Sequence, residues 1–291
     1  MKKVAFLSMD NLDGFVCYDH LTFEPLRNLG WQAEEISWRN PHIEWDRYDA
    51  VIVRSTWDYQ SKPGKFSAVL EKINSVTHLE NKLSIIKWNM NKNYLKDLQD
   101  KGIKIVNTVW EKAFIPQKFE YYFDFLDSDE IIIKPNISAN AENTFRIKKD
   151  DSKNQLHIME PVFSKREFMV QKFMKNIIDE GEYSLFYFGE EYSHSILKVP
   201  KEKDFRVQEE HGGKIFSINP DREMKRTAEE ILNKVKPAPL YARIDLVKTQ
   251  DNEFVLIELE LIEPSLYFNL DDKSPHRFAG IFNEWMTLRL R

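Results

Sequence analysis

The chain has few glycines, and their spacing excludes two common phosphate-binding loops. Nine glycines are spread over 291 residues, at positions 14, 30, 64, 102, 181, 189, 212, 213 and 280. They form neither the G-x-G-x-x-G pattern of dinucleotide-binding folds nor the G-x-x-x-x-G-K pattern of P-loop proteins. A nucleotide bound here would therefore be held by lysines, arginines and a metal ion.

Other absences exclude further classes of protein. The single cysteine, Cys17, rules out an internal disulfide and fits a reducing compartment. The histidines lie too far apart for H-x-x-x-H zinc spacing, and no G-x-S-x-G motif of serine hydrolases occurs. The first apolar run is too short for a signal peptide, and no run is long enough to span a bilayer. We therefore expect a soluble, cytoplasmic protein without a membrane partner.

The charge balance and the length restrict the class of protein and the number of domains. The 42 basic and 47 acidic residues give a net charge of −5, which argues against nucleic acid as a partner. At roughly 150 residues per domain, the length predicts about two domains. The hydrophobic content of 42% is ordinary for a globular protein with real cores.

The amino-terminal part predicts a parallel α/β sheet. Short apolar strands are expected over 3–8, 31–37 and 50–54, with a helical stretch over 18–29. Ligands bind past the carboxyl ends of such strands, so the loop 54–59 is a candidate binding loop. The alternative is a capped turn anchored by its tryptophan.

The rest of the chain predicts a mixture of strands and helices. Residues 146–149 and 155–159 are expected to pair as a hairpin, and 183–188 and 192–199 as antiparallel strands. Further strands are expected over 103–106, 131–134, 168–173, 240–247 and 253–262, and helices over 65–73, 91–101, 225–235 and 275–289.

The strongest chemical signal lies in the two apolar strands on either side of residues 251–252. Side chains alternate along a strand, so Arg243 and Asp245 share one face, and Glu258 and Glu260 share one face. A two-residue turn at 251–252 pairs residues whose numbers sum to 503. Asp245 then lies opposite Glu258, and Arg243 opposite Glu260.

This arrangement places three carboxylates and one arginine on one side of an apolar hairpin. Two carboxylates about 4 Å apart repel each other by roughly 4 kcal/mol at an effective dielectric constant near 20. One arginine offsets only part of this repulsion between the carboxylates, and a divalent cation such as Mg²⁺ would offset the rest. The alternative is a solvated polar face with Arg243–Glu260 as a surface pair.

Several cations are placed to hold phosphates. Lys134 ends an apolar strand, and Lys92 falls in the first turn of a predicted helix, where a cation opposes the helix dipole. Lys198 ends another strand, and Arg206 precedes the only double glycine, 212–213. With the carboxylates, they describe a nucleotide site built from side chains and a Mg²⁺-assisted phosphoryl transfer.

Four segments together resemble the ATP-grasp carboxylate–amine ligases, and the resemblance covers nearly the whole chain. These segments are Lys134-Pro135, Gln171-Lys172-Phe173, Arg243-Ile244-Asp245 and Glu258-Leu259-Glu260. Residues 54–59, 87–95 and 260–267 are most similar to the branch that contains the O-ureido-serine cyclo-ligase and glutathione synthetase ATP-binding domains.

The resemblance implies an α/β (α+β) ATP-grasp fold in two domains. An amino-terminal, Rossmann-like parallel-sheet domain would span 1–83, and the ATP-grasp domain 84–291. Within the latter, a small lid subdomain would span about 105–172 and an antiparallel-sheet catalytic subdomain about 173–291.

The resemblance also assigns roles to residues. Arg243 would steady the tetrahedral intermediate and Arg206 would contact phosphate. From its place at the end of a strand, we expect Lys198 to be a third catalytic cation. The metal ligands would be Asp245, Glu258 and Glu260. The nucleotide would be held by Lys92, Lys134, the linker Gln171, Lys172 and Phe173, and a ribose carboxylate from Asp179 or Glu180. The substrate would contact Arg54, Thr56, Trp57, Asp58, Tyr59 and Ser265, the charged members pairing with a zwitterion and the aromatic ones packing against it.

One segment departs from the family pattern. The lid loop over the phosphates usually carries glycine, but residues 136–144 contain none. Asn140 and Asn143 are the residues there that best tolerate a positive φ.

We therefore expect a ligase that uses ATP and Mg²⁺, or Mn²⁺ in its place, to activate a small carboxylate as an acyl phosphate. The carboxylate would be an amino acid or a derivative, and an amine would then form a C–N bond as ADP and phosphate are released. The alternatives are a nucleotide-binding module without ligase activity and a small-molecule kinase on the same fold. The partners are expected to be small-molecule carboxylate and amine substrates, and the protein a monomer or homodimer.

Overall fold

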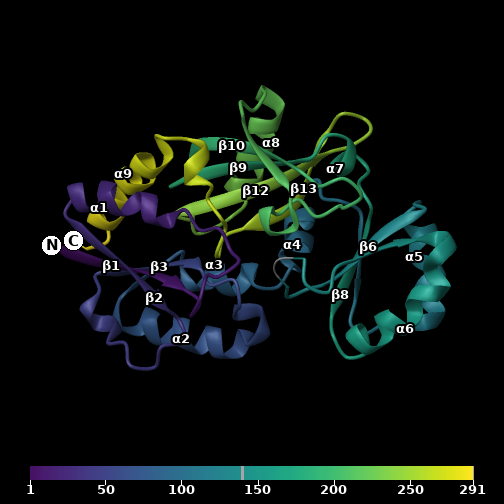
Figure 1. The fold of residues 1–291 in the computed structure, drawn as a ribbon, viewed down its shortest axis with the longest axis horizontal. Coiled ribbons are helices and arrows are strands. Elements are labelled where there is room, and N and C mark those ends of the chain that lie inside the picture. Colours follow the sequence, from purple (N-terminus) through teal and green to yellow (C-terminus); the bar gives the residue numbers. More distant parts are fainter. Residues whose placement is uncertain (139–140, 291) are drawn as a thin grey trace.

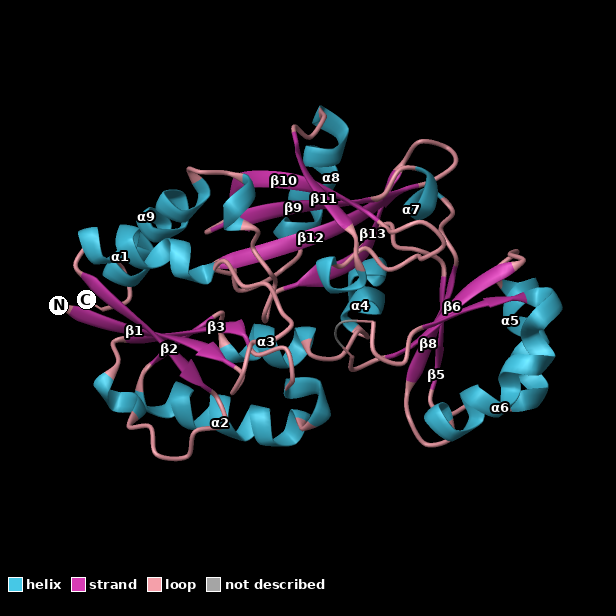
Figure 2. Cartoon of the chain, in the orientation of Figure 1, coloured by secondary structure: helices cyan, strands magenta, loops and turns pink. Residues whose placement is uncertain are grey.

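Three β-sheets with helices packed against them make up the chain (Figures 1 and 2). The computed structural model describes residues 1–138 and 141–290, so Asn140 of the lid loop lies outside the described residues. The combination of a parallel sheet with antiparallel sheets confirms the predicted α/β (α+β) class. In the described part of the chain, no helix has the length and apolar character needed to cross a membrane.

The amino-terminal sheet is parallel, as its alternating strands and helices predict, with the order β2-β1-β3-β4. The helix expected over 18–29 is shorter, because a 3-10 turn (Asp19–Thr22) comes first and Pro25 then falls in the first turn of α1, where a missing N–H costs no bond. The strands of this parallel sheet are β1 (Lys2–Ser8), β2 (Trp31–Ser37), β3 (Ala50–Ser55) and β4 (His78–Glu80). The helices of the amino-terminal part are α1 (Phe23–Asn28), α2 (Pro63–Val76) and α3 (Leu83–Asn89).

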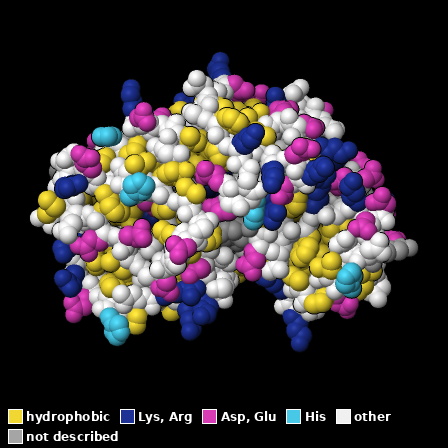
Figure 3. Space-filling model, in the orientation of Figure 1, with side chains coloured by type: hydrophobic (Ala, Val, Ile, Leu, Met, Phe, Trp, Pro, Cys, Tyr) yellow, Lys and Arg dark blue, Asp and Glu magenta, His cyan; other side chains and the backbone are white. Residues whose placement is uncertain are grey.

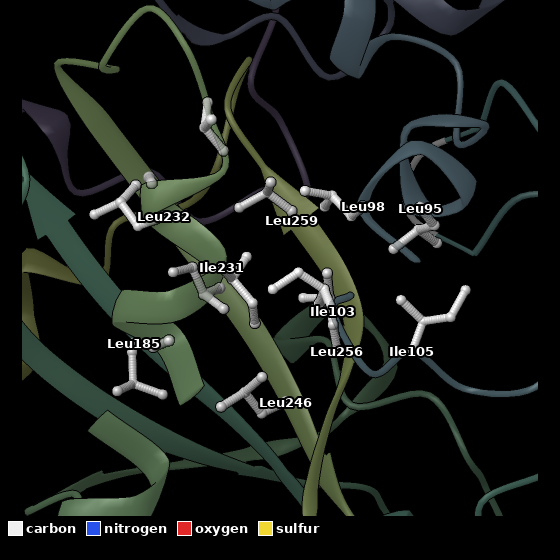
Figure 4. Packing of buried hydrophobic residues seen from close by; sticks show 14 of the residues in the cluster. Leu95, Leu98, Ile103, Ile105, Leu185, Ile231, Leu232, Leu246, Leu256 and Leu259 are labelled. Atoms are coloured by element: carbon white, nitrogen blue, oxygen red, sulfur yellow. The ribbon is translucent and has the colours of Figure 1, made fainter. Parts of the chain in front are cut away.

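The central sheet is antiparallel, with the order β11-β10-β9-β12-β13. Its strands are β9 (Glu182–Phe188), β10 (Glu191–Val199), β11 (Lys214–Ile218), β12 (Tyr241–Lys248) and β13 (Phe254–Glu260). Helices α4 (Tyr94–Asp100) and α8 (Arg222–Asn233) cover one face of this sheet. Figure 4 shows the resulting core, in which Leu95, Leu98, Ile231 and Leu232 of the helices gather with Leu185, Leu246, Leu256 and Leu259 of the strands.

The opposite face of the central sheet changes from apolar to polar along its strands. At one end, Tyr241 and Phe188 pack in a cluster with Phe6 of the parallel sheet and Phe278 of α9 (Ser274–Thr287). Two and four residues further along β12, Arg243 and Asp245 occupy the same face. The amino-terminal sheet and α9 therefore cover the apolar half and leave the charged half to line a cleft.

A third sheet forms the lobe on the right of Figure 1, with the order β5-β8-β6-β7. The hairpin expected over 146–149 and 155–159 is wrong, because only 145–148 is a strand and α6 follows it. Leu156, Met159 and Phe163 recur at helical spacing and pack onto this sheet. Its elements are β5 (Thr108–Glu111), β6 (Glu130–Pro135), β7 (Phe145–Lys148), β8 (Phe168–Lys172), α5 (Phe119–Phe125) and α6 (Ser152–Phe163), and α7 (Asn176–Asp179) follows β8.

The strand expected over 103–106 is also absent. Ile105 makes only an isolated bridge to Leu256 of β13, and the edge strand β5 begins three residues later at Thr108. Residues 103–106 thus connect α4 to the third sheet and contact the edge strand β13 of the central sheet.

The carboxylate hairpin has the predicted pairs but not the predicted turn. Arg243 lies opposite Glu260, and Asp245 opposite Glu258. The turn, however, comprises the three residues 250–252, with Asn252 at a φ of 63°. A β-bulge at Ile257 absorbs the extra residue, so that Leu246 faces Leu256 and the pairing beyond it sums to 502.

Candidate active site

The polar half of the central sheet lines a cavity of about 200 Å³ at the meeting point of the three sheets. Figure 3 shows a notch on this face between the lobe of the third sheet and the rest of the molecule. The predicted residues that line the cavity, called the cleft below, are Trp57, Tyr59, Lys92, Lys134, Gln171, Lys172, Phe173, Lys198, Arg206, Arg243, Asp245, Glu258, Glu260 and Ser265.

Asp245 lies at the centre of the charged face, where three donors surround its carboxylate. Arg243 binds it in a fork, with Nε 3.1 Å from Oδ1 and Nη2 3.0 Å from Oδ2. The Ser184 hydroxyl donates to Oδ1, and the Lys198 ammonium lies 3.4 Å from it. Burial alone would raise the pKa of Asp245, but Arg243 and Lys198 hold it below its usual value.

Glu258 forms an ion pair with Lys92, across the cleft from β13. Lys92 does not fall in the first turn of a helix as predicted: α4 begins at Tyr94, and Lys92 lies in the preceding turn, with its backbone N–H donating to Asn136. Burial would raise the pKa of Glu258, but Lys92 and Lys134 lower it below its usual value.

Glu260 shares the guanidinium of Arg243 with Asp245. Burial, with the like charges of Glu258 and Asp245, raises the pKa of Glu260 to about 7 despite the arginine. Like charges thus crowd this face, as the hairpin pattern predicts.

The donor chemistry of these three carboxylates fits Mg²⁺, which prefers oxygen ligands. Over residues 1–138 and 141–290, no three acidic, histidine or cysteine side chains are arranged closely enough to hold a metal ion as they stand. Each carboxylate is instead turned toward a cation, Lys92 or Arg243. A metal ion would therefore compete with Lys92 and Arg243 for these carboxylates.

Lys134 points a half-buried ammonium into the cleft from β6. Within the described residues, no hydrogen bond or ion pair holds it. Burial lowers the pKa of Lys134, Glu258 raises it and Lys92 lowers it. An unpaired cation beside an acidic face is suited to bind a phosphate.

The end of β8, Gln171 and Lys172, and the next residue, Phe173, lie along the cleft. The Gln171 amide donates to the Thr108 hydroxyl at 3.1 Å, and the Lys172 ammonium to the Asp127 carbonyl at 2.9 Å. These side chains are thus held by the third sheet.

Asp179 and Glu180, proposed for the ribose, do not line the cleft. Glu180 instead contacts Asn176 and the Tyr183 hydroxyl. Glu182 does line the cleft and forms an ion pair with Lys198. Sequence reasoning missed Glu182 because it placed the start of the strand at Tyr183; one residue more puts Glu182 on the face of Ser184.

Arg206 reaches the cleft from an irregular loop and pairs with Asp204, 2.8 Å between Nη2 and Oδ2. Hydrogen bonds from Arg206 hold the pKa of Asp204 well below its usual range. Gly213 packs directly against the backbone of Val207 in the same loop. A Cβ at position 213 would lie only 2.1 Å from the Val207 carbonyl oxygen. The double glycine thus shapes the loop that carries Arg206.

The amino-terminal loop contributes Trp57 and Tyr59 to the cleft, whereas Arg54, Thr56 and Asp58 do not line it. Asp58 instead accepts from Trp38 Nε1 at 2.7 Å and pairs with Arg39 at 2.7 Å. The structure brings only the aromatic members of the expected substrate loop to the cavity.

Arg54 is 2% exposed and supports the loops around the cleft from behind. Its Nη2 lies 2.9 Å from Asp19 Oδ1 and 2.9 Å from the Pro264 carbonyl oxygen. Trp57 Nε1 donates to the Glu263 carbonyl at 2.8 Å. The amino-terminal sheet is therefore attached to the loop that follows β13.

Part of the glycine-free lid loop also reaches the cleft, through Ser138, Ala141 and Thr144. Asn143 has a φ of 52°, which confirms its predicted tolerance of positive φ, and Ala141 has a φ of 56°. Side chains other than glycine thus supply the left-handed backbone of this loop.

Comparisons with known proteins extend over most of the chain. The family model of the prokaryotic glutathione synthetase ATP-grasp domain matches residues 102–265, and that of the amino-terminal domain of D-cycloserine synthetase DcsG matches residues 4–81. The cycloserine biosynthesis protein DcsG of Streptomyces lavendulae is 26% identical over 284 residues, 90% of this chain and 91% of that protein.

Solved structures share the fold from end to end. D-cycloserine synthetase DcsG matches with a TM-score of 0.82 at 22% identity, covering 98% of this chain and 99% of that chain. The ligase PsnB, complexed with a phosphomimetic variant of its minimal precursor, Mg and ADP, has a TM-score of 0.67 at 14% identity over 99% and 98%. D-alanine–D-alanine ligase of Bacillus anthracis has a TM-score of 0.69 at 12% identity over 100% and 98%.

A match to the ATP-grasp domain over more than half of the chain, the charged cleft and the shared fold lead to one conclusion. The chain belongs to the prokaryotic glutathione synthetase ATP-grasp family, whose members use ATP and Mg²⁺, and it is an ATP-dependent carboxylate–amine ligase.

Proposed function

We propose that the chain activates a small amino acid, or a derivative of one, as an acyl phosphate and joins it to an amine. The observation that carries this proposal is that Lys92, Lys134 and Arg243 line the same cleft as Asp245, Glu258 and Glu260. The match to DcsG over 90% of the chain supports an amino-acid substrate.

The roles follow from the positions of the side chains. Lys134, which has no partner in the described part of the chain, and Lys92 would bind the phosphates of ATP. We propose Glu182, which lines the cleft, for the ribose in place of Asp179 or Glu180. When bound to Asp245, Glu258 and Glu260, Mg²⁺, or Mn²⁺ in its place, would neutralise charge on the phosphates.

The two chemical steps need positioning above all. A substrate carboxylate oxygen bonds to the γ-phosphorus of ATP, the bond from that phosphorus to ADP breaks, and ADP leaves. The neutral amine nitrogen then bonds to the acyl carbon, the carbon–oxygen bond to phosphate breaks, and the phosphate leaves with the one proton that the nitrogen gives up. Arg243, with Arg206 and Lys198, would hold the anionic oxygens.

The substrate would lie between the charged face and the amino-terminal loop. Trp57, Tyr59 and Ser265 line that side of the cleft. We propose the same domain limits as the sequence predicts, with residues 1–83 supplying this loop, and a protein that acts as a monomer or homodimer.

The test is ADP release with MgATP across D- and L-amino acids, O-ureido-serine and simple amines, with Asp245→Asn as the blank. We expect substrate-dependent ADP that disappears in the variant, and a hydroxamate when hydroxylamine replaces the amine. ADP without a hydroxamate would instead identify a kinase. MgATP binding without turnover of any compound would contradict the proposal.

A further inference from the structure

Glu263 is an acid of the cleft to which the steps above assign no role. It lies three residues beyond Glu260, half-buried, on the loop that follows β13, and it lines the cavity. Within residues 1–138 and 141–290, no side chain forms a hydrogen bond or ion pair with its carboxylate. Four other acids that line the cleft, by contrast, each face a cation: Glu182 and Asp245 face Lys198, Glu258 faces Lys92, and Glu260 faces Arg243.

The backbone of Glu263 is fixed while its side chain is left without a partner. Trp57 Nε1 donates to its carbonyl oxygen at 2.8 Å, and Arg54 Nη2 donates to the next carbonyl, of Pro264, at 2.9 Å. The Tyr241 hydroxyl lies 2.9 Å from the preceding carbonyl, of Ile262. Three consecutive carbonyls are thus held by buried or half-buried side chains, which sets where the carboxylate lies.

The surroundings of this carboxylate favour binding of a positively charged ligand. Burial and the neighbouring Glu260 and Glu258 raise the pKa of Glu263 to about 8, and Lys92 and Arg243 offset them only in part. Burial, and after it the charge of Glu263, raises the pKa of Tyr59 well above its usual value. A cationic ligand would bind a site where like charges are poorly compensated.

Aromatic side chains complete the site. Trp57, which donates to the Glu263 carbonyl, and Tyr59, whose pKa the charge of Glu263 raises, line the same cavity, and ring faces attract ammonium groups. A carboxylate beside aromatic rings is a chemistry that recognises a protonated primary amine.

We propose that Glu263 binds the α-ammonium group of the amino acid whose carboxylate is activated, and so selects amino acids over simple carboxylic acids. This inference rests on the proposed function and identifies the α-ammonium group as the part of the substrate that this site recognises. It gives Glu263 the role first expected of Asp58, whose carboxylate is occupied by Trp38 and Arg39 outside the cleft.

The experiment compares matched pairs of carboxylates with hydroxylamine as the acceptor, so that the tested ammonium belongs to the carboxylate substrate. The pairs are alanine with propionate and serine with 3-hydroxypropionate, both enantiomers of each amino acid, with ADP release and hydroxamate as readouts. The proteins are wild type, Glu263→Gln, Glu263→Asp and, as a matched control, Glu229→Gln on the exposed side of α8.

We expect Glu263→Gln to lower kcat/KM for the amino acids roughly 10- to 100-fold, mainly through KM, as for loss of a charge-assisted hydrogen bond. The simple acids should change less than about twofold, Glu263→Asp should retain part of the preference, and Glu229→Gln should match wild type. Equal losses on both members of a pair, no loss on either, or weakened MgATP binding would overturn the inference.

The two proposals can fail separately. If wild type binds MgATP but releases no ADP with any compound, the proposed function fails, and the same pairs are then titrated by calorimetry in the presence of a non-hydrolysable ATP analogue. A preference for amino acids that disappears in Glu263→Gln would still support the ammonium site. Equal affinity of wild type for both members of every pair would overturn it.

Discussion

Lys92, in the turn before α4, and Glu258, on β13, form an ion pair across the cleft. The lysine side chain is 10% exposed and the glutamate side chain 30% exposed, so water screens the pair only in part. A cation expected to bind phosphate and an acid expected to bind a metal thus neutralise each other in the structure.

This pairing predicts the effect of Lys92→Met. Removing the ammonium leaves Glu258 facing only Lys134 at a distance, so we expect a loss of about 1–2 kcal/mol in the free energy of unfolding. Affinity for ATP should fall about tenfold or more, since a phosphate contact is lost. Urea unfolding and nucleotide titration measure the two effects. Lys104→Met, which breaks the exposed pair with Glu253, is the control and should cost less than about 0.5 kcal/mol.

Glu258→Gln should abolish ADP formation while leaving the fold intact. The amide keeps the shape of the side chain but removes the charge that a metal ion needs. ADP release and circular dichroism measure the two outcomes. Glu253→Gln, at the exposed end of the same hairpin, should keep wild-type activity. Substantial activity in Glu258→Gln would show that this carboxylate is not a metal ligand.

The raised pKa of Glu263 predicts a dependence of stability on pH. Its folded pKa of about 8 lies above the ordinary value of 4.5, so between these pH values the folded state keeps a proton that the unfolded state has released. Stability from this group is therefore present below pH 4.5 and lost as pH rises toward 8.

The measurement is urea unfolding of the ligand-free protein at pH 5 and pH 8.5. Glu263→Gln lacks this titration, so its stability relative to wild type should rise by about 1–2 kcal/mol between the two values. Glu229→Gln should follow wild type. A parallel course of Glu263→Gln and wild type would mean that the carboxyl titrates near its ordinary pKa.

The approach of Gly213 to the loop before it predicts the effect of Gly213→Ala. A methyl group would lie 2.1 Å from the Val207 carbonyl oxygen, so the loop that carries Arg206 must move. We expect a loss of at least about tenfold in kcat/KM, since a misplaced catalytic group has a large effect on rate.

The control is Gly280→Ala in α9, where a Cβ would contact nothing within 4 Å. This change should raise the free energy of unfolding by about 0.5–1 kcal/mol and leave activity unchanged. Normal activity in Gly213→Ala would show that the position of Arg206 does not matter for turnover.

Much of the fold and of the charged face can be predicted from local patterns. Alternation along two apolar strands is enough to place Asp245 opposite Glu258, because a register shift of one residue would expose an apolar face. The parallel amino-terminal sheet follows in the same way from buried strands separated by helices.

What sequence reasoning missed depends only in part on contacts between distant segments. Asp58 is a plausible substrate residue in a loop after a strand, but Arg39 and Trp38, from the connection after β2, occupy it. Glu182 was missed because a strand boundary is uncertain by one residue, and α6 because its apolar residues fit helix and strand spacing almost equally. Of these outcomes, only the occupation of Asp58 depends on contacts between distant segments.

The bulge at Ile257 has a practical consequence for modifying the protein. The bulge lies between the turn at 250–252 and the paired acids, and it absorbs the extra residue. The pairing of the acids therefore does not depend on the length of the turn. A spectroscopic label or an affinity tag inserted in this turn would therefore leave the pairing of Asp245 with Glu258 in place. The turn thus offers an attachment point that lies outside the lining of the cleft.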